Sequence, residues 1–437
     1  MTKLRLGLRH EDKSRWERRT PLTPDHVRRL INEHGLEVIV QPSPTRVFPD
    51  AAYEAAGATL NADLSTCPVI VGLKEMPTVF FEQGKTYIFF SHTIKGQSHN
   101  MPMLQRLMDL NCTLLDYEKI VDDNGKRLIF FGRFAGLAGM IDTLWSLGLR
   151  LKAEGYSTPF EKIGQAYHYD CLEDAENHVR EAGELITRNG LPRELGPMVM
   201  GFTGYGNVSG GAQEIFELLP HKVISPDALQ TFIESGEWDN RVCYKVVYRE
   251  EDMNAPKDAS QTFALQDYYD HPEKYKSTFE PHLQWLSVMI NCIYWDTPYP
   301  KLATNAGLRT LFENSETPRL KLIGDITCDI DGSVEPTVRA TQPDNPAYVY
   351  DPVDNSMTDG FEGRGIVILP VDNFPCELPR ESSIHFGDAL YPYIAEIAKA
   401  DYTRPLDDLG YSGPIKNSTL VHQGALTPNF DYLKKYL

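Results

Sequence analysis

The stretch that most constrains the fold is PMVMGFTGYGNVSGGAQEIFELLP, residues 197–220. It runs from an apolar segment of strand length, through a glycine-rich turn, into a segment with helical periodicity. Gly204 permits a tight turn, and Gly206 lets the backbone approach a phosphate group closely. The N–H groups at the start of the helix, including those of Asn207 and Val208, would face that phosphate at the positive end of the helix dipole. The stretch therefore predicts a Rossmann-type unit that binds a dinucleotide.

The choice of cofactor depends on a residue about 20 positions after such a turn. In many Rossmann units an acid at the end of the second strand binds the ribose 2′-hydroxyl group and repels a 2′-phosphate. Here the second strand is expected in HKVISPDAL (221–229), and Ser225 occupies that position. The sequence therefore favours NADP(H) and allows NAD(H), for which Asp227 remains available.

Strand and helix patterns alternate along most of the chain. A helix is expected over 23–35, with Thr23 as its N-cap, Pro24 at its first position and Gly35 after its end. Alternation of this kind builds a parallel sheet with helices on both faces. The expected fold class is α/β, with two Rossmann-like doubly wound domains and a cleft between them.

The length of 437 residues exceeds what a single hydrophobic core usually serves. We expect residues 148–344 to form the dinucleotide-binding domain. Residues 1–147 and 345–437 are expected to form a discontinuous substrate and catalytic domain, because the strand and helix patterns after 345 do not continue the nucleotide unit. A long helical pattern over 134–155 is expected to connect the two domains.

Composition excludes several classes of protein. The net charge of −18 disfavours nucleic acid and anionic lipid as partners, because the surface repels phosphate groups. The seven cysteines are scattered without a CxxC pair, which indicates reduced thiols and no metal site. No apolar run approaches the ~20 residues that span a bilayer. The N-terminus MTKLRLGLRHEDK lacks the apolar core of a signal peptide, so a cytoplasmic location is expected.

Charged side chains gather where the predicted strands of the first domain end. They are Arg9, Glu11, Glu17, Arg18, Arg19, Lys74, Glu75, His92, Lys95, Glu118 and Arg127. In doubly wound sheets, ligands bind beyond the carboxyl ends of the strands. A lysine among apolar strands has its ammonium form disfavoured, and a histidine titrates near neutral pH, so both suit proton transfer. Solvent exposure of strand ends explains any one of these residues, but a shared catalytic site explains the whole set better.

Several longer motifs resemble a known family when they are taken in order. They are LRHEDKSRWERRTPLTP, VGLKEMP, FFSHTIKGQ, LLDYEKI, FFGRFAGLAGMID, FTGYGNVSGGAQEIF, INCIYW, DITCDIDGSVE and FGDALYPYI. This series is similar to the lysine–2-oxoglutarate reductase half of aminoadipic semialdehyde synthase and, more distantly, to the fungal lysine-forming saccharopine dehydrogenase. Both belong to the alanine dehydrogenase and transhydrogenase fold group. The similarity covers nearly the whole chain, loosely over 226–285, and implies a free-standing reductase.

The resemblance implies that lysine condenses with 2-oxoglutarate and that a nicotinamide cofactor reduces the imine to saccharopine, or the reverse. It assigns Lys74 and His92 as the acid–base pair. The substrate-binding positions that it implies are Arg19, Glu75, Lys95, Glu118 and Arg127. The cofactor-binding positions, including those expected from the turn, are Gly204, Gly206, Asn207, Val208, Ser225, Asn291 and Asp325.

Two alternative functions remain at this stage. An alanine dehydrogenase-like enzyme would use ammonia and pyruvate with the same fold and a lysine–histidine pair. A nucleotide-sensing protein with a degenerate catalytic site is the second alternative. The sequence also leaves open the direction of the reaction, the oligomeric state, and whether a related diamine replaces lysine.

Overall fold

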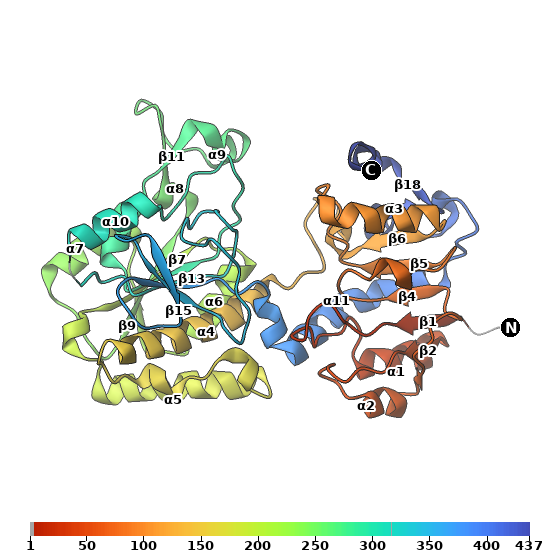
Figure 1. Ribbon diagram of the computed structural model, residues 1–437, viewed down its shortest axis with the longest axis horizontal. Coiled ribbons are helices and arrows are strands. Elements are labelled where there is room, and N and C mark those ends of the chain that lie inside the picture. The colour runs from red at the N-terminus through yellow and green to blue at the C-terminus, as the bar shows by residue number, and fades with distance from the viewer. Residues whose placement is uncertain (1–3, 316) are drawn as a thin grey trace. The chain divides into compact units, whose positions relative to one another are not determined.

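The computed structural model describes residues 4–315 and 317–437, and the chain divides into two compact units. The first unit combines Met1–Phe131 with Pro379–Leu437, and the second is Gly132–Leu378. In Figure 1 the C-terminal segment, coloured blue, accordingly belongs to the same unit as the red and orange N-terminal strands. The expected α/β class with two doubly wound units, the first completed by the C-terminal segment, is confirmed.

The sheet of the first unit has the strand order β18-β17-β6-β5-β4-β1-β2-β3. Its strands are β1 (Arg5–Leu8), β2 (Glu37–Val40), β3 (Thr59–Leu60), β4 (Val69–Val71), β5 (Thr86–Phe89), β6 (Thr113–Asp116), β17 (Thr419–His422) and β18 (Ala425–Leu426). Strands β1 to β6 pair in parallel, and the last two strands of the chain add an antiparallel edge.

Both faces of this sheet are buried. Val69 and Val71 of β4 pack into a core with α1 (Pro24–His34) and α11 (Pro379–Lys399), whereas Ile70 between them packs toward α3 (Met101–Asp109). Burial on both faces explains why the strands read as continuous apolar runs. Two shorter helices, α2 (Asp50–Ala55) and α12 (Gly413–Ser418), complete the unit.

The expected limits of the first helix are confirmed in α1. Thr23 has an extended backbone before the helix, and its N–H donates to His26 Nδ1 at 3.2 Å. Gly35 follows the helix with φ of 67°, a left-handed conformation that glycine adopts without steric cost.

The sheet of the second unit has the strand order β15-β14-β16-β13-β12-β7-β9-β8. Its strands are β7 (Met198–Thr203), β8 (His221–Val223), β9 (Cys243–Tyr248), β12 (Val288–Asn291), β13 (Leu322–Asp325), β14 (Tyr348–Asp351), β15 (Ser356–Asp359) and β16 (Ile366–Leu369). The helices are α4 (Gly132–Ala153), α5 (Leu172–Asn189), α6 (Asn207–Phe216), α7 (Pro226–Ser235), α8 (Glu250–Met253), α9 (Leu265–Asp270) and α10 (Asn305–Glu313). Strands β10 (Asn254–Pro256) and β11 (Tyr275–Ser277) form a separate antiparallel pair.

The second unit, Gly132–Leu378, is longer at both ends than the expected 148–344. Strand β16 pairs in parallel with β13, and β14 pairs antiparallel with β16, so residues 348–369 extend the second sheet rather than the first. Val367 and Leu369 of β16 pack into the core that contains α4. Only α11 and the residues after it return to the first unit, and α4 belongs to the second unit from its first residue.

Every described helix is too short or too polar to cross a membrane. The seven cysteines are all free thiols, and five of them are buried.

Helices α4 and α6 pack at backbone distance because glycines meet there. A Cβ atom at Gly136 would overlap the carbonyl oxygen of Val208, and a Cβ atom at Gly211 would overlap the carbonyl oxygen of Arg133. Gly210, on the same turn of α6, has no other group within 4 Å of where its Cβ would lie. Gly211 therefore fixes the position of α6, the helix that follows the glycine turn.

We expect Gly211→Ala to destabilise the protein by about 1–3 kcal/mol, because the extra methyl group forces two backbones apart. Gly210→Ala is the matched control, and we expect it to raise stability by up to about 1 kcal/mol through helix propensity alone. Urea unfolding of both variants, followed by circular dichroism, measures the difference. Equal stabilities of the two variants would contradict close packing at Gly211.

A pair of buried carboxyl groups joins α4 to the end of the second unit. Asp142 and Glu377 are close enough for their charges to interact, and Asp142 Oδ1 accepts from the backbone N–H of Ala166 at 2.7 Å. Burial raises the pKa of Asp142 to about 7. Burial, followed by the charge of Asp142, raises the pKa of Glu377 well above its usual value. The folded protein therefore holds a proton here at a pH where the unfolded chain has released it.

We expect Asp142→Asn to stabilise the protein progressively, relative to wild type, as the pH rises from about 4 to about 7. The stabilising contribution of protonated Asp142 is complete below its unfolded pKa near 4 and is lost as the pH rises through about 7. Within that window the loss is at most about 1.4 kcal/mol per pH unit. Asparagine keeps an acceptor for Ala166 and has no proton to lose. Urea unfolding across this pH range tests the expectation, with Glu184→Gln on the exposed face of α5 as control. A stability difference that does not vary with pH would contradict it.

Candidate functional site

The candidate catalytic residues of the first unit lie on loops at one edge of its sheet. Strands β6, β5, β4 and β1 are consecutive neighbours and mutually parallel, so their carboxyl ends meet at the same edge. Lys74 and Glu75 follow β4, His92 follows β5, and Glu118 follows β6. The sequence-predicted cluster is therefore brought together at the edge where ligands bind in folds of this kind.

Glu75 connects His92 to a second cation. Its Oε1 lies 2.7 Å from His92 Nδ1, and its Oε2 lies 2.6 Å from Lys13 Nζ. Burial alone would raise the pKa of Glu75, but the hydrogen bonds from His92 and Lys13 outweigh burial and hold the pKa well below its usual range. Because an ionised carboxylate only accepts, His92 donates from Nδ1, which leaves Nε2 for proton transfer.

Lys74 lies in an environment that disfavours its charged form. Burial lowers the pKa of its ammonium group, and the positive charge of Arg19 lowers it further, against the opposing charges of Glu17 and Glu75. Among the described residues, Lys74 has no carboxylate oxygen within 4.0 Å of its nitrogen. A lysine with a lowered pKa can exchange protons near neutral pH, as a general acid or base must.

Arg19 is held in a buried ion pair beside Lys74. Its Nε and Nη2 donate to the two carboxylate oxygens of Glu17 at 2.7 and 2.5 Å, and both side chains are about 1% exposed. The guanidinium group also lies over the ring of Phe131, 4.2 Å from its centroid. Arg19 was expected to bind a substrate carboxylate, and in this structure one bidentate face of its guanidinium is occupied by Glu17.

Two buried carboxylates that the sequence analysis left without a role hold the loops in place. Glu11 accepts from the backbone N–H groups of Leu73 at 2.7 Å and Lys74 at 2.9 Å. Asp116 accepts from the backbone N–H of Ser91 at 3.0 Å and from its hydroxyl group, directly before His92. The sequence signal for both was an acid at a strand end, within RHEDK and LLDYEKI.

Burial is the main cause of raised pKa values in both of these carboxyl groups. The pKa of Glu11 rises to about 7, to which the nearby charge of Glu17 contributes, and the pKa of Asp116 rises to about 6, to which Glu118 contributes. His92 itself has a left-handed backbone with φ of 48°, and its carbonyl oxygen accepts from Asn100 Nδ2 at 3.2 Å. A strained residue that its neighbours hold in place is typical of functional sites.

The other predicted substrate residues lie at the rim of this edge. Glu118 Oε1 and Arg127 Nη2 form an ion pair at 2.5 Å, and the Arg127 side chain is 44% exposed. Lys95 is exposed, and its backbone N–H donates to Gln97 Oε1 at 3.0 Å. Arg127 thus keeps a solvent-facing guanidinium group close to an acid, whereas Arg19 lies inside.

The glycine turn of the second unit has the geometry that was expected from its sequence. Gly204 follows β7 with φ of 82°, and α6 begins at Asn207, so Val208 and Ser209 lie in the first turn of the helix. Gly206 has no other group within 4 Å of its missing Cβ, so its backbone is open to a ligand. The first N–H groups of a helix have no intrahelical acceptor and can bind a phosphate group.

Asn291 and Asp325 are buried within the same sheet edge. Thr203 Oγ1 donates to Asn291 Oδ1 at 2.9 Å, and Asn291 Nδ2 donates to Asp325 Oδ1 at 2.8 Å. Thr337 Oγ1 donates to the other oxygen of Asp325 at 2.5 Å. This network joins the ends of β7, β12 and β13, so both predicted cofactor residues have a structural role in shaping the edge.

Strand order places Ser225 further from the glycine turn than was expected. The strand that contains His221–Val223 is at the outer edge of the sheet, and β9 lies between it and β7. Ser225 precedes α7, two residues after this outer strand. The position next to the glycine turn is instead the end of β9, where Arg249 and Glu250 follow Tyr248.

A cavity of about 260 Å³ lies between the glycine turn and the end of β9. Five tyrosines line it: Tyr205, Tyr268, Tyr269, Tyr294 and Tyr299. Glu250 Oε1 accepts from the Tyr269 hydroxyl group at 2.8 Å, whereas its Oε2 is buried and has no partner among the described residues. An aromatic cavity with one unpaired carboxylate oxygen fits the adenosine part of a dinucleotide, whose ribose carries hydroxyl donors.

Comparison with known proteins agrees with this geometry. Residues 7–138 match the family model described as alanine dehydrogenase/PNT, N-terminal domain. The chain is 40% identical to an α-aminoadipic semialdehyde synthase of Arabidopsis thaliana, over 98% of this chain and 41% of that protein. It is 37% identical to the mitochondrial α-aminoadipic semialdehyde synthase of Bos taurus, over 98% of this chain and 47% of that protein. A lysine-forming saccharopine dehydrogenase of Yarrowia lipolytica is 28% identical over 91% of this chain and 93% of its own length. The expected resemblance to these enzymes is confirmed.

The relatives differ in how much of their length the chain covers. The chain spans less than half the length of the α-aminoadipic semialdehyde synthases and nearly all of the saccharopine dehydrogenase. Its fold is that of a solved L-alanine dehydrogenase, with a TM-score of 0.60 at 16% identity and 99% coverage of both chains. The relatives thus support an oxidoreductase that acts on the C–N bond of an amino acid with a nicotinamide cofactor.

Proposed function

We propose that the chain reductively condenses L-lysine with 2-oxoglutarate to saccharopine, or catalyses the reverse, lysine-forming reaction. The observation that carries the proposal is the environment of Lys74, with its lowered pKa, on the loop next to the Glu75–His92 pair. Imine formation requires an uncharged amine and several proton transfers. Lys74 and His92 are suited to remove the proton from the amine and to carry out the later transfers.

The residues of the first unit support each of these proton transfers. An unprotonated Lys74 can remove a proton from the incoming ε-ammonium group, and His92 Nε2 can exchange the proton that accompanies carbinolamine formation and loss of water. Glu75 fixes the orientation of the His92 ring through Nδ1. The exposed guanidinium group of Arg127 suits a substrate carboxylate, with which it can form two parallel hydrogen bonds. The reduced nicotinamide, when bound, supplies hydride to the imine carbon.

An alanine dehydrogenase-like activity is the rival proposal. It would share the lysine and histidine but would join ammonia to pyruvate, without a second amino acid to bind. The family resemblance places the additional acids at this edge, Glu75 and Glu118, beside the amino groups of the substrate, which favours a second amino acid. The similarity to saccharopine dehydrogenases over nine-tenths of both chains also favours the first proposal.

We expect nicotinamide oxidation only when lysine and 2-oxoglutarate are both present. Lys74→Met should reduce kcat by at least about 100-fold, the usual scale of general acid–base catalysis, and should leave cofactor affinity unchanged. Lys126→Met, which removes an exposed lysine from the same unit, is the control and should retain full activity. Steady-state absorbance at 340 nm measures both effects. Oxidation with pyruvate and ammonia alone would exclude the proposal in favour of its rival.

The cofactor that we propose is NADP(H), with NAD(H) as the alternative. Arg249 is exposed, lies at the end of β9, and stacks over Tyr205 of the glycine turn with 4.9 Å from its guanidinium carbon to the ring centroid. A guanidinium group at this strand end suits a ribose 2′-phosphate, whereas the neighbouring Glu250 suits ribose hydroxyl groups. Because β9 lies next to β7, we attribute the expected preference for NADP(H) to Arg249 rather than to Ser225.

We expect Arg249→Gln to reduce the preference for NADPH over NADH at least about tenfold, which corresponds to the loss of one charge-assisted hydrogen bond. Ser225→Ala should leave the preference unchanged, and Arg241→Gln controls for the loss of an exposed charge in the same unit. The ratio of kcat/KM values for the two cofactors measures the effect. A change at Ser225 but none at Arg249 would show that the outer strand selects the cofactor.

The proposed partners are the small-molecule substrates and the cofactor. These partners do not assign a location, and the mammalian relatives are named as mitochondrial.

A further inference from the structure

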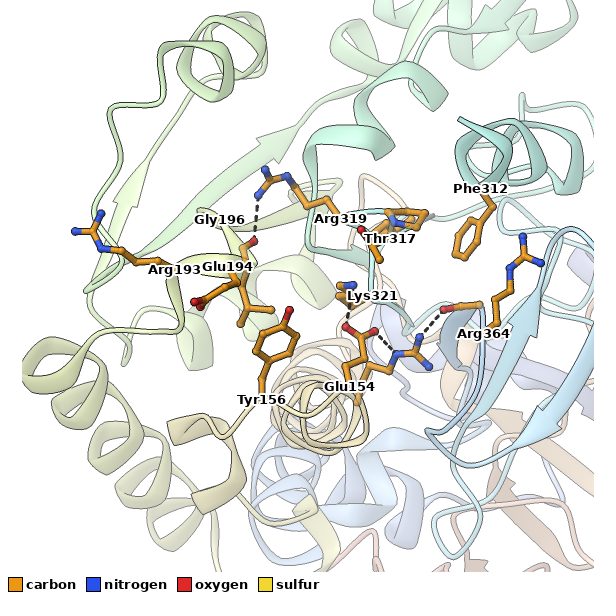
Figure 2. Close-up of a pocket in the computed structure, with 15 residues that line it drawn as sticks. Glu154, Tyr156, Arg193, Glu194, Gly196, Phe312, Thr317, Arg319, Lys321 and Arg364 are labelled. Atoms are coloured by element: carbon orange, nitrogen blue, oxygen red, sulfur yellow. Dashed lines mark hydrogen bonds and ion pairs between the residues drawn. The ribbon is translucent and has the colours of Figure 1, made fainter. Parts of the chain in front are cut away.

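The second unit has a cavity at the edge of its sheet opposite to the glycine turn. It has a volume of about 560 Å³ and lies where β7, β13 and β16 begin. Its walls are the loops that precede these parallel strands, together with the C-terminal end of α4 (Figure 2). Because the strands are parallel, this edge is separate from the edge that carries the candidate cofactor site.

The lining of this cavity is positively charged in a chain whose net charge is −18. Its charged side chains are the cations Arg150, Arg193, Arg319, Lys321 and Arg364 and the acids Glu154 and Glu194. The excess of three positive charges lies within one concave surface. Low-dielectric walls strengthen the field of charges that are grouped in this way.

One carboxylate serves two of the cations. Glu154 Oε1 accepts from Arg150 Nε at 2.8 Å, and Glu154 Oε2 lies 2.9 Å from Lys321 Nζ. The guanidinium group of Arg150 is further held by the carbonyl oxygens of Phe361, Gly363 and Gly365. Figure 2 shows Lys321 and Glu154 meeting in the middle of the cavity, with the Tyr156 hydroxyl group directed toward it. Arg150, Lys321 and Glu154 together therefore carry a net charge of one positive unit.

Arg319 has no acid partner among the residues that the structure describes. Within residues 4–315 and 317–437, no carboxylate oxygen lies within 4.0 Å of its guanidinium group, although the side chain is half-buried and burial lowers its pKa. Its Nη1 donates only to the carbonyl oxygens of Pro197 at 3.1 Å and Leu195 at 3.4 Å. Gly196 has φ of 67°, and a Cβ atom there would come within 2.6 Å of Nη1. The absence of a side chain at Gly196 thus leaves room for the Arg319 guanidinium group at the wall of the cavity.

Arg364 is a further cation of the cavity lining, and its one acid partner among the described residues is distant. Its Nε is 3.9 Å from Asp351, the longest ion pair among the described residues, and its side chain is 54% exposed. In Figure 2 it rises beside Phe312, across the cavity from Arg319.

We propose that this cavity binds a small organic or inorganic polyanion with two or three carboxylate or phosphate groups. Arginine forks bind such oxyanions in two parallel hydrogen bonds, and Arg319 and Arg364 lie on opposite walls of the cavity with Lys321 between them. The volume suits a metabolite rather than a peptide or a nucleic acid. The site is independent of the proposed catalytic function, because its residues take no part in either candidate site.

Isothermal titration calorimetry on the full chain tests the site, with citrate as the carboxylate probe and pyrophosphate as the phosphate probe. NADPH is kept saturating, so that pyrophosphate does not compete for the glycine turn. We expect one of the two probes to bind with a stoichiometry of one and to weaken as salt is raised. Arg319→Gln should weaken it at least about tenfold, equivalent to one charge-assisted contact.

Two further variants keep the test decisive. Arg364→Gln removes an exposed side chain whose loss the fold tolerates, and it should weaken the same probe about threefold or more even where Arg319→Gln unfolds the chain. Arg188→Gln, on the exposed end of α5, removes the same charge elsewhere in the unit and should have no effect. Absence of binding by both probes, or equal affinities in wild type and Arg364→Gln, would overturn the proposal.

Discussion

The candidate catalytic site depends on two buried carboxylates that bind backbone rather than substrate. Glu11 holds the N–H groups of Leu73 and Lys74, and Asp116 holds the N–H and hydroxyl groups of Ser91, one residue before His92. Each carboxylate extends from one strand to the loop after its neighbour. An unsatisfied buried N–H costs about 1–3 kcal/mol, so these bonds fix the loops strongly. Proton transfer requires this precision, since a displacement of about 1 Å can reduce a rate about 100-fold.

Two other acids, Glu17 and Glu75, explain how Lys74 can have a lowered pKa inside an acidic protein. The acids nearest to it are already engaged: Glu17 with Arg19, and Glu75 with His92 and Lys13. Because their negative charges are largely balanced by these partners, burial and the positive charge of Arg19 dominate the pKa of Lys74. Arg19 thereby gains a second role besides the substrate binding expected from its sequence context. Removing its charge would restore the ammonium form of Lys74 as well as weaken any carboxylate contact.

Local signals in the sequence predicted much of this structure. The sequence over 23–35 defines α1, and Gly204 defines the turn after β7, because each depends only on neighbouring residues. Strand order is different, since it depends on which apolar edges meet in three dimensions. The segments at 243–248 and 366–369 have strand-like apolar patterns. The sequence did not predict that they pair with β7 and β13. The difference in the unit boundaries follows from that limit, and so does the proposal that the end of β9, not Ser225, selects the cofactor.

Charge distribution explains how the second unit can offer two separate sites to anions. A net charge of −18 repels anions, but at physiological ionic strength this repulsion is screened beyond about 8 Å. An anionic ligand is then governed by the few groups that it approaches within that distance. The glycine turn offers N–H groups and Arg249, and the opposite edge offers Arg319 with Lys321 and Arg364. An acidic surface therefore excludes anions in general and confines their binding to concave sites where backbone donors or unpaired guanidinium groups converge. The two edges of one parallel sheet can in this way hold different anions without competition between them.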